Sequence, residues 1–237
     1  MIIQACLNGA RPVGYHPALP LTKEAMVTDA LACVAAGAGE LHIHPRGANG
    51  KESLAVVDEL VGDIRSACPG TLVGVSTGAW IENDVKSTRE HINAWSIIPD
   101  YASVNLSEVD APAIFSLLET KGVGIEVGLA TVKDAERFVT LPQRNKVFRV
   151  LLEIEEQDLN QAEMTMEGIQ AVLAKAGVQR PILLHGFDAT VWHFVRKARE
   201  KRWSTRIGLE DGCTLEDQSI AQSNAVLVGE AVAIYQR

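Results

Sequence analysis

Short apolar segments alternate along the chain with longer segments of helical periodicity. Apolar runs of about four to eight residues that end at Gly, Pro, Asn or Asp are typical of buried strands. This pattern predicts strands at residues 2–7, 41–44, 71–75, 101–106, 123–127, 146–152, 181–184 and 206–209. It predicts helices at residues 25–36, 53–67, 84–95, 111–121, 132–138, 159–176, 189–201 and 219–235.

A regular succession of strand and helix predicts a parallel sheet, because parallel neighbours need a crossover connection. Eight such units without a linker between them favour a single domain over residues 1–237, folded as a (β/α)8 TIM barrel. The alternative is a doubly wound sheet. Its glycine fingerprint is missing, because Gly122, Gly124 and Gly128 have the wrong spacing and lie before or within a strand.

Two histidines stand at positions i and i+2 of the second predicted strand. Side chains at this spacing share one face of a strand, so His42 and His44 converge. Pro45 and Gly47 end the strand, which places both imidazoles beside a loop. A pair of convergent imidazoles is half of a typical zinc site, so we interpret this segment as metal-binding.

Polar side chains follow nearly every predicted strand, at the end where the active site of a (β/α)8 barrel forms. They are Asn8, His42, His44, Ser76, Thr77, Asn105, Glu126, Glu153, His185, Glu210 and Asp211. A catalytic zinc typically has three protein ligands. Strand spacing leaves Glu210, Glu153, Glu126 and His185 open as the third. Arg206 lies on the same predicted face as Glu210 and would stabilise a neighbouring carboxylate as the anion.

Composition excludes several classes of function. The net charge of −8 disfavours nucleic-acid binding, which requires a basic surface. The sequence has no apolar run of the ~20 residues that a membrane span needs, and no signal-peptide pattern at its start. The four cysteines are scattered and form no C-x-x-C motif, which predicts reduced thiols in a cytoplasmic protein.

Several of these segments resemble one known family, the β-keto acid cleavage enzymes, whose type member is 3-keto-5-aminohexanoate cleavage enzyme. The matching segments are Asn8-Gly9-Ala10, His42-Ile43-His44-Pro45-Arg46, Ser76-Thr77-Gly78 and Arg206-Ile207-Gly208-Leu209-Glu210-Asp211. The resemblance implies a zinc-dependent (β/α)8 barrel that assembles as a homotetramer. It also implies a reaction in which a β-keto acid and acetyl-CoA become acetoacetate and a new acyl-CoA.

The resemblance further implies a role for each matching residue. His42, His44 and Glu210 would bind zinc, one ion per chain. Asp211 would be the base that removes the α-proton, together with Arg206 and Ser76. Substrate contacts would come from Asn105, Thr77 and Gly78.

Arg11 departs from the family pattern. The aminohexanoate enzyme carries an acidic residue after the Asn-Gly-Ala segment, where it binds the amino group of the substrate. A cation at this position predicts a keto acid with a second carboxylate or a neutral tail, provided that Arg11 faces the pocket.

Other readings of the same motifs remain. A metal-dependent amidohydrolase would use His42 and His44 with His185 and Asp211, although that class has its His-x-His pair on the first strand. A metal aldolase and a barrel that binds a ligand without turnover are further alternatives.

Overall fold

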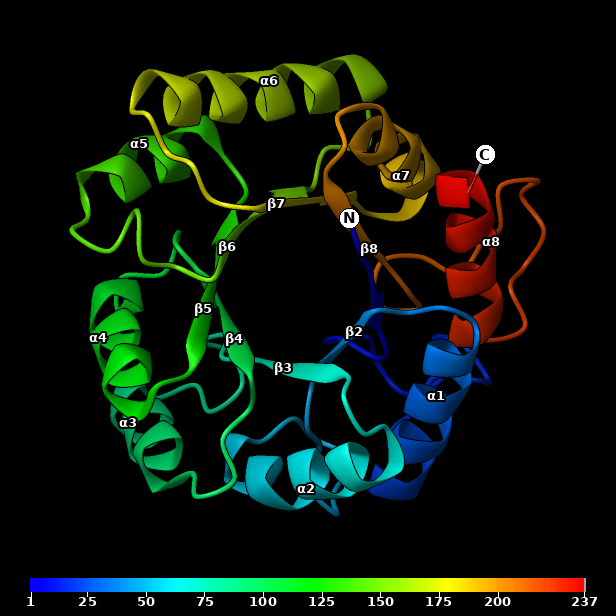
Figure 1. The fold of residues 1–237 in the computed structure, drawn as a ribbon. Helices are drawn as coiled ribbons and strands as arrows, with labels where there is room; N and C mark the ends of the chain where they lie inside the picture. The colour runs from blue at the N-terminus through cyan, green and yellow to red at the C-terminus, as the bar shows by residue number, and fades with distance from the viewer. Residues whose placement is uncertain (237) are drawn as a thin grey trace.

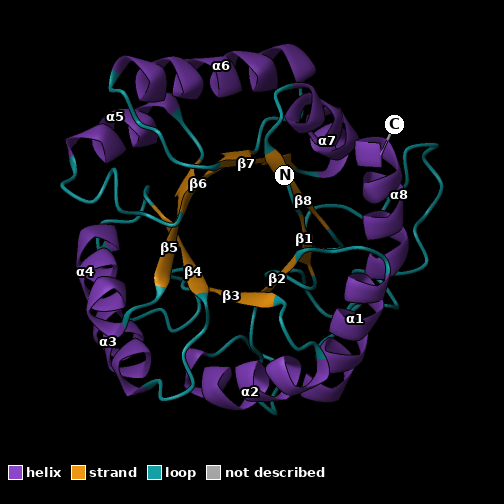
Figure 2. Cartoon of the chain, in the orientation of Figure 1, coloured by secondary structure: helices purple, strands orange, loops and turns teal. Residues whose placement is uncertain are grey.

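Eight parallel strands form a closed barrel surrounded by helices (Figures 1 and 2). The computed structural model describes residues 1–236. The strands are β1 (Ile3–Cys6), β2 (Glu40–Ile43), β3 (Leu72–Ser76), β4 (Tyr101–Asn105), β5 (Gly124–Leu129), β6 (Arg149–Ile154), β7 (Ile182–Gly186) and β8 (Ser204–Ile207). The helices are α1 (Lys23–Ala35), α2 (Val57–Ala67), α3 (Val85–Ala94), α4 (Ala111–Lys121), α5 (Val132–Thr140), α6 (Leu159–Lys175), α7 (Val191–Glu200) and α8 (Asn224–Gln236). Short 3₁₀ turns, η1 (Leu54–Val56) and η2 (Asp188–Thr190), precede α2 and α7.

Closure of the ring confirms the predicted (β/α)8 architecture. Each strand pairs in parallel with the next in sequence, and β1 pairs with β8, where Gln4 lies opposite Arg206. The apolar core is formed by side chains of both the strands and the outer helices. Because all strands run the same way, their carboxyl ends meet at one rim of the barrel.

Local sequence signals set many of the element ends. The Thr22 hydroxyl accepts a hydrogen bond from the Ala25 N–H and caps α1. Thr131 and Asp134 form a reciprocal capping box at the start of α5. Gly122 ends α4 in the left-handed conformation, with φ of 73°.

Four predicted boundaries were wrong in ways that matter for the site. The last helix begins at Asn224 rather than at residue 219. Residues 214–220 instead form a loop that is closed by an antiparallel bridge between Thr214 and Ile220. The Asn224 side chain then accepts from the Leu209 N–H and donates to the Leu7 carbonyl, which ties this helix to β1. Strands β5 and β6 each end two residues later than predicted, and β8 already ends at Ile207.

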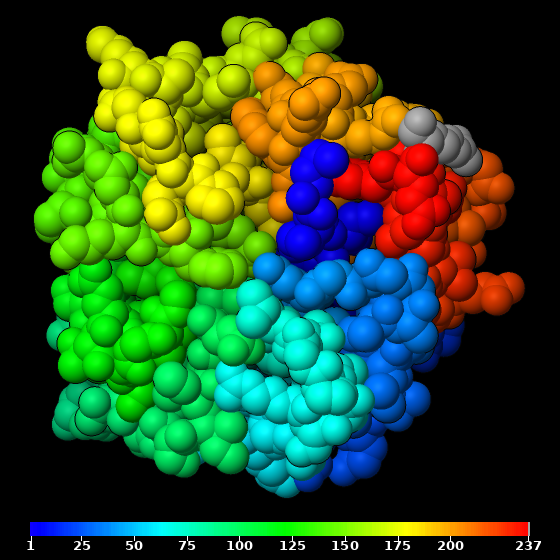
Figure 3. Space-filling view, viewed as in Figure 1, coloured from blue at the N-terminus to red at the C-terminus, as the bar shows by residue number. Residues whose placement is uncertain are grey.

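The later end of β5 corrects the prediction that Glu126 belongs to the rim. Glu126 is the third residue of β5, is fully buried, and forms an ion pair with Arg149 at the start of β6. Arg149 also contacts Glu40 at 2.5 Å, and its guanidinium lies 4.7 Å from the centre of the Tyr101 ring. These side chains occupy the barrel interior near the amino ends of the strands, and the space-filling view shows that face filled by side chains (Figure 3).

Two further expectations concern the chain as a whole. Within residues 1–236, every helix is too short or too polar to cross a membrane. All four cysteines are free, as predicted; Cys6, Cys33 and Cys68 are buried and Cys213 is half-buried.

The buried ion network predicts a large stability effect at Arg149. Arg149→Met should lower the free energy of unfolding by about 3–5 kcal/mol, because it leaves two buried carboxylates without their cation. Urea unfolding followed by circular dichroism measures this loss. Lys86→Met, which breaks an exposed pair with Glu90, should cost less than about 1 kcal/mol. A similarly small loss for Arg149→Met would show that the network contributes little.

Candidate functional site

A cavity of about 550 Å³ opens at the carboxyl ends of the strands. Its lining includes most of the residues that the sequence singled out: Arg11, His42, His44, Ser76, Asn105, Glu153, Arg206 and Glu210. Side chains from β2, β3, β4, β6 and β8 thus meet at one rim, as parallel strands in a closed ring require.

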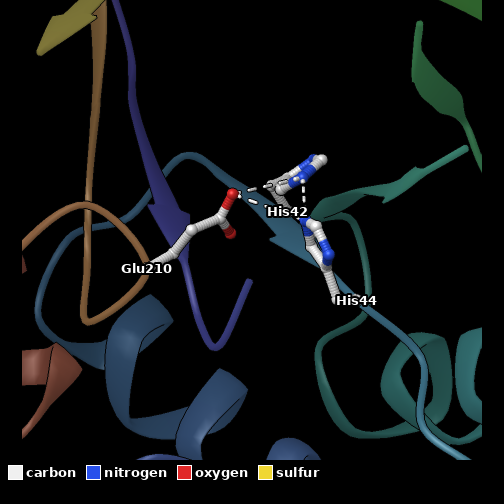
Figure 4. Close-up of side chains that lie close together, drawn as sticks. All are labelled: His42, His44 and Glu210. Carbon is white, nitrogen blue, oxygen red and sulfur yellow. Dashed lines mark hydrogen bonds and ion pairs between the residues drawn. The ribbon is translucent and has the colours of Figure 1, made fainter. Parts of the chain in front are cut away.

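Three of these side chains form a candidate metal centre (Figure 4). The Nε2 atoms of His42 and His44 lie 3.3 Å apart, and Glu210 Oε1 lies 3.4 Å from His44 Nε2 and 3.9 Å from His42 Nε2. One ligand atom from each residue falls within 4.8 Å of the other two. Figure 4 shows the Glu210 carboxylate directed from the loop after β8 toward the two imidazoles of β2. Two imidazoles and a carboxylate are a donor set typical of catalytic zinc.

Other predicted candidates for the third ligand lie elsewhere. Glu126 is paired with Arg149 at the base of the barrel. Glu153 and His185 belong to β6 and β7 and are close to each other, with 3.9 Å between Oε1 and Nε2. Among the described residues, Glu210 is the acidic side chain that joins His42 and His44 in a cluster of potential ligands.

Backbone geometry at the end of β1 makes room for this centre. Gly9 adopts φ of +53°, and a Cβ atom there would lie 2.4 Å from Cγ of Glu210. Glycine is therefore required both by the conformation and by the close approach of the carboxylate. Its neighbour Asn8 accepts from the His44 N–H and donates to the His44 carbonyl, each at 3.0 Å, which fixes the end of β2 against β1.

The two imidazoles have opposite pKa shifts. Burial lowers the pKa of His42 to about 4. Burial alone would also lower the pKa of His44, but Glu210 and Glu52 outweigh it and raise the pKa to about 9. Burial alone would raise the pKa of Glu210, but Arg206 and the two imidazoles bring it well below its usual range. The centre therefore contains an ionised carboxylate and an imidazole that carries a proton when no metal replaces it.

Glu52 is a functional candidate that the sequence analysis missed. Its carboxylate contacts His44 Nδ1 through Oε1 and accepts from Trp80 Nε1 at 2.8 Å through Oε2. A carboxylate behind a ligand histidine selects the ring tautomer that leaves Nε2 free for metal. Glu52 lies eight residues after His44, beyond a glycine-containing loop, so no strand or helix spacing relates the two.

Arg206 connects the metal centre to the predicted base. Its Nη2 donates to Glu210 Oε1 at 2.7 Å and to Asp211 Oδ1 at 2.6 Å, while its Nε donates to Asp211 Oδ1 at 3.1 Å. Asp211 is fully buried, and its second oxygen, Oδ2, has no hydrogen-bond donor. The predicted contact between Arg206 and a neighbouring carboxylate is thus present, although Glu210 lies beyond the strand and not on its face.

Two predicted substrate contacts do not line this cavity. The Thr77 hydroxyl donates to the Ser103 carbonyl at 2.7 Å and supports the wall between β3 and β4. The aromatic ring of Trp80 lies against Gly78, where a Cβ atom would come within 2.2 Å of it. Ser76 and Asn105 do line the cavity, as predicted.

Arg11 reaches the cavity, but its charge is already paired. Its Nη2 lies 2.8 Å from Asp188 Oδ1, and its Nε donates to the Glu210 carbonyl at 3.0 Å. The prediction of an anionic or neutral substrate tail required that Arg11 face the pocket, and Arg11 does line the cavity. The contact with Asp188, which precedes α7 and is distant in sequence, leaves its guanidinium less available to a substrate carboxylate.

Comparison with solved structures shows the same fold in several enzymes. ObcA in its apo form superimposes with a TM-score of 0.74 at 16% identity, over 92% of this chain and 61% of that chain. A type I 3-dehydroquinate dehydratase from Clostridium difficile gives a TM-score of 0.66 at 12% identity, over 99% of this chain and 90% of that one. This chain therefore spans about three fifths of the length of ObcA.

Sequence comparison is more specific. A curated protein, 3-oxoadipate:acetyl-CoA acetyltransferase of Cupriavidus necator, is 26% identical over 268 residues, covering 98% of this chain and 87% of that protein. The family model of the beta-keto acid cleavage enzyme matches residues 1–237, the whole sequence. Because this match covers residues 1–237, the chain belongs to the β-keto acid cleavage enzymes.

Proposed function

We propose that this protein is a zinc-dependent β-keto acid cleavage enzyme that uses acetyl-CoA as co-substrate. A β-keto acid would condense with the acetyl group, and thiolysis by the released CoA would give acetoacetate and a new acyl-CoA. The observation that carries the proposal is the convergence of His42, His44 and Glu210 next to the Arg206–Asp211 pair. The acetyl-CoA acetyltransferase relative supports the choice of co-substrate.

The donor set fits a divalent metal. The three candidate ligand atoms face one another, and Glu210 Oε2 is buried without a hydrogen-bond donor. Glu52 and Arg206 orient His44 and Glu210 from behind. When bound, zinc would supply a Lewis acid that stabilises the enolate of the keto acid.

The remaining residues would move and orient the proton. We assign Asp211 as the base, with Oδ2 as the accepting atom because Oδ1 is already engaged by Arg206. Ser76 lines the cavity, so its hydroxyl would orient or relay the α-proton. Asn105 would contact the substrate directly, whereas Thr77 and Gly78 would support the wall that binds it.

Acyl transfer to CoA would then follow in a cavity large enough for the keto acid and the acetyl thioester. We retain two further predictions: the homotetramer, which the family implies, and the cytoplasm, which the scattered cysteines indicate.

An amidohydrolase function is less well supported, because it requires His185 at the metal, and His185 lies between Glu153 and Asp211 instead.

Metal analysis combined with an activity assay tests the proposal. The purified protein should contain about one zinc per chain and release acetoacetate only when both acetyl-CoA and a β-keto acid are present. His42→Ala with His44→Ala should abolish both metal content and activity. Unchanged metal content in the double variant, or hydrolysis that does not depend on CoA, would refute the proposal.

Metal uptake should depend on pH through His44. Because its pKa is raised to about 9, the imidazole is protonated at pH 7 and must lose that proton to bind metal. We therefore expect the apparent zinc affinity to rise about tenfold per pH unit between pH 6 and 8. Calorimetry in buffers of different ionisation enthalpy would also show about one proton released per zinc bound.

Glu52→Gln provides the matched control for this pH dependence. The substitution removes one of the carboxylates that raise the pKa of His44, so that pKa should fall. The pH range over which zinc affinity rises should therefore shift to lower pH. Zinc affinity at pH 8 should also fall about 10–100-fold, since the tautomer is no longer fixed by an anion. An affinity that is flat between pH 6 and 8 in the wild type would contradict the charge state assigned to His44.

Asp211→Asn should retain the metal and the fold but lose acyl transfer. Removal of a general base typically costs roughly 10²–10⁴ in rate, and the amide can still accept from Arg206 through its oxygen. Steady-state acetoacetate release measures the loss, with zinc content and thermal melting as controls. A turnover rate within about threefold of the wild type would remove Asp211 from the mechanism.

A further inference from the structure

The charges around the cavity are unevenly paired. Arg206 contacts both Glu210 and Asp211, and Arg11 contacts Asp188. Both cavity-lining guanidinium groups are therefore already engaged with carboxylates. This side of the cavity, formed by β2, β8 and the loops after β1 and β8, also contains the candidate metal centre.

Glu153 provides an acidic group on the other side, with no such partner. It lies on β6, which is opposite β2 in the ring of eight strands. Its side chain is 18% exposed, and its nearest basic group is His185, whose Nε2 is 3.9 Å from Oε1. His185 is itself shared, because its Nδ1 lies 3.4 Å from Asp211 Oδ1.

Burial raises the pKa of Glu153, because the carboxylate is removed from water without a cation at hydrogen-bond distance. A mostly buried carboxylate with no cation closer than 3.9 Å is costly, and a ligand that supplies a cation relieves that cost. A ligand with a second carboxylate would add repulsion instead, because Glu155 lies at the same side of the cavity.

Gly128 leaves room for a neutral acceptor, the Asn105 side-chain oxygen, next to the Glu153 carboxylate. It lies between Asn105 of β4 and Glu153 of β6, and a Cβ atom at this position would be 2.9 Å from Asn105 Oδ1 and 3.3 Å from Glu153 Oε2. The missing Cβ lets both oxygens extend over the end of β5 into the cavity. Two acceptor oxygens from neighbouring strands form a site for a group that donates several hydrogen bonds.

We propose that Glu153 determines substrate specificity by binding a protonated amine on the tail of the β-keto acid, with Asn105 as a second acceptor. The inference rests on the proposed function, which assigns the keto-acid end of the substrate to the metal side. With that end at His42 and His44, the tail extends across the cavity to β6. Arg11, in contrast, is already engaged by Asp188 and is less available to an anionic tail.

Three keto acids of equal chain length test this proposal, with an amine, a methyl group or a carboxylate at the same tail position. The wild-type kcat/KM with saturating acetyl-CoA should favour the amine at least about tenfold over each of the others. In Glu153→Gln the amine-to-methyl ratio should fall by about tenfold or more, because the ion pair is lost and the shape is kept. Glu155→Gln is the matched control: its exposed side chain is screened by water, so the ratio should change less than about threefold.

Binding measurements separate failure of this inference from failure of the proposed function. Calorimetric titration of the zinc-loaded protein with the three acids, without acetyl-CoA, reports tail selectivity even if no acetoacetate forms. Amine-selective binding that Glu153→Gln abolishes would support the site even if turnover refuted the cleavage reaction. A wild-type preference for the carboxylate or methyl acid, or a ratio that Glu153→Gln leaves unchanged, would overturn it. The wild-type ranking alone decides the case if the variant does not fold.

Discussion

One buried guanidinium holds the candidate site together. Arg206 lies on β8 and is 2% exposed. It donates to two consecutive carboxylates: Glu210, which faces the imidazoles, and Asp211, the assigned base. A charge of this kind is tolerated inside a protein only when it is paired and hydrogen-bonded. The same contacts keep Glu210 anionic and leave one oxygen of Asp211 free, so the proposed metal binding and the proposed proton transfer both depend on Arg206.

Strand spacing was sufficient to predict the parts of the site that belong to regular structure. His42 on β2 and His44, the first residue after it, converge because the extended chain alternates its side chains, and the barrel follows from eight repeated units. The third ligand could be named only by resemblance, because Glu210 lies in a turn after β8, where no periodicity applies. Glu126 was misplaced for a related reason: a two-residue error at the end of β5 moves a side chain from the rim into the interior.

Pairings between distant segments were beyond the reach of the sequence. The contact of Arg11 with Asp188 joins loops that only the folded ring brings together, and the contact of Glu52 with His44 lies within one irregular loop, where no strand or helix spacing applies. Such contacts decide which charged side chains of the cavity remain available to a substrate, and the residue type alone does not. Arg11 in the sequence predicted an anionic or neutral substrate tail. In the fold Arg11 is paired with Asp188, and the basic neighbour of Glu153 is His185 at 3.9 Å, an arrangement that fits the proposed cationic tail instead.

Closure of the barrel also makes the first and last units of the chain neighbours. Strand β1 pairs with β8, and α8 packs against α1, so this junction resembles the other seven junctions of the ring. The start of the chain and the end of α8 lie at the face opposite the cavity (Figure 1). A circularly permuted chain, opened in a loop on that face and joined across the old ends, would keep every strand pairing and leave the cavity loops uncut. The ring thus decouples the order of the eight units in the gene from the geometry of the catalytic rim.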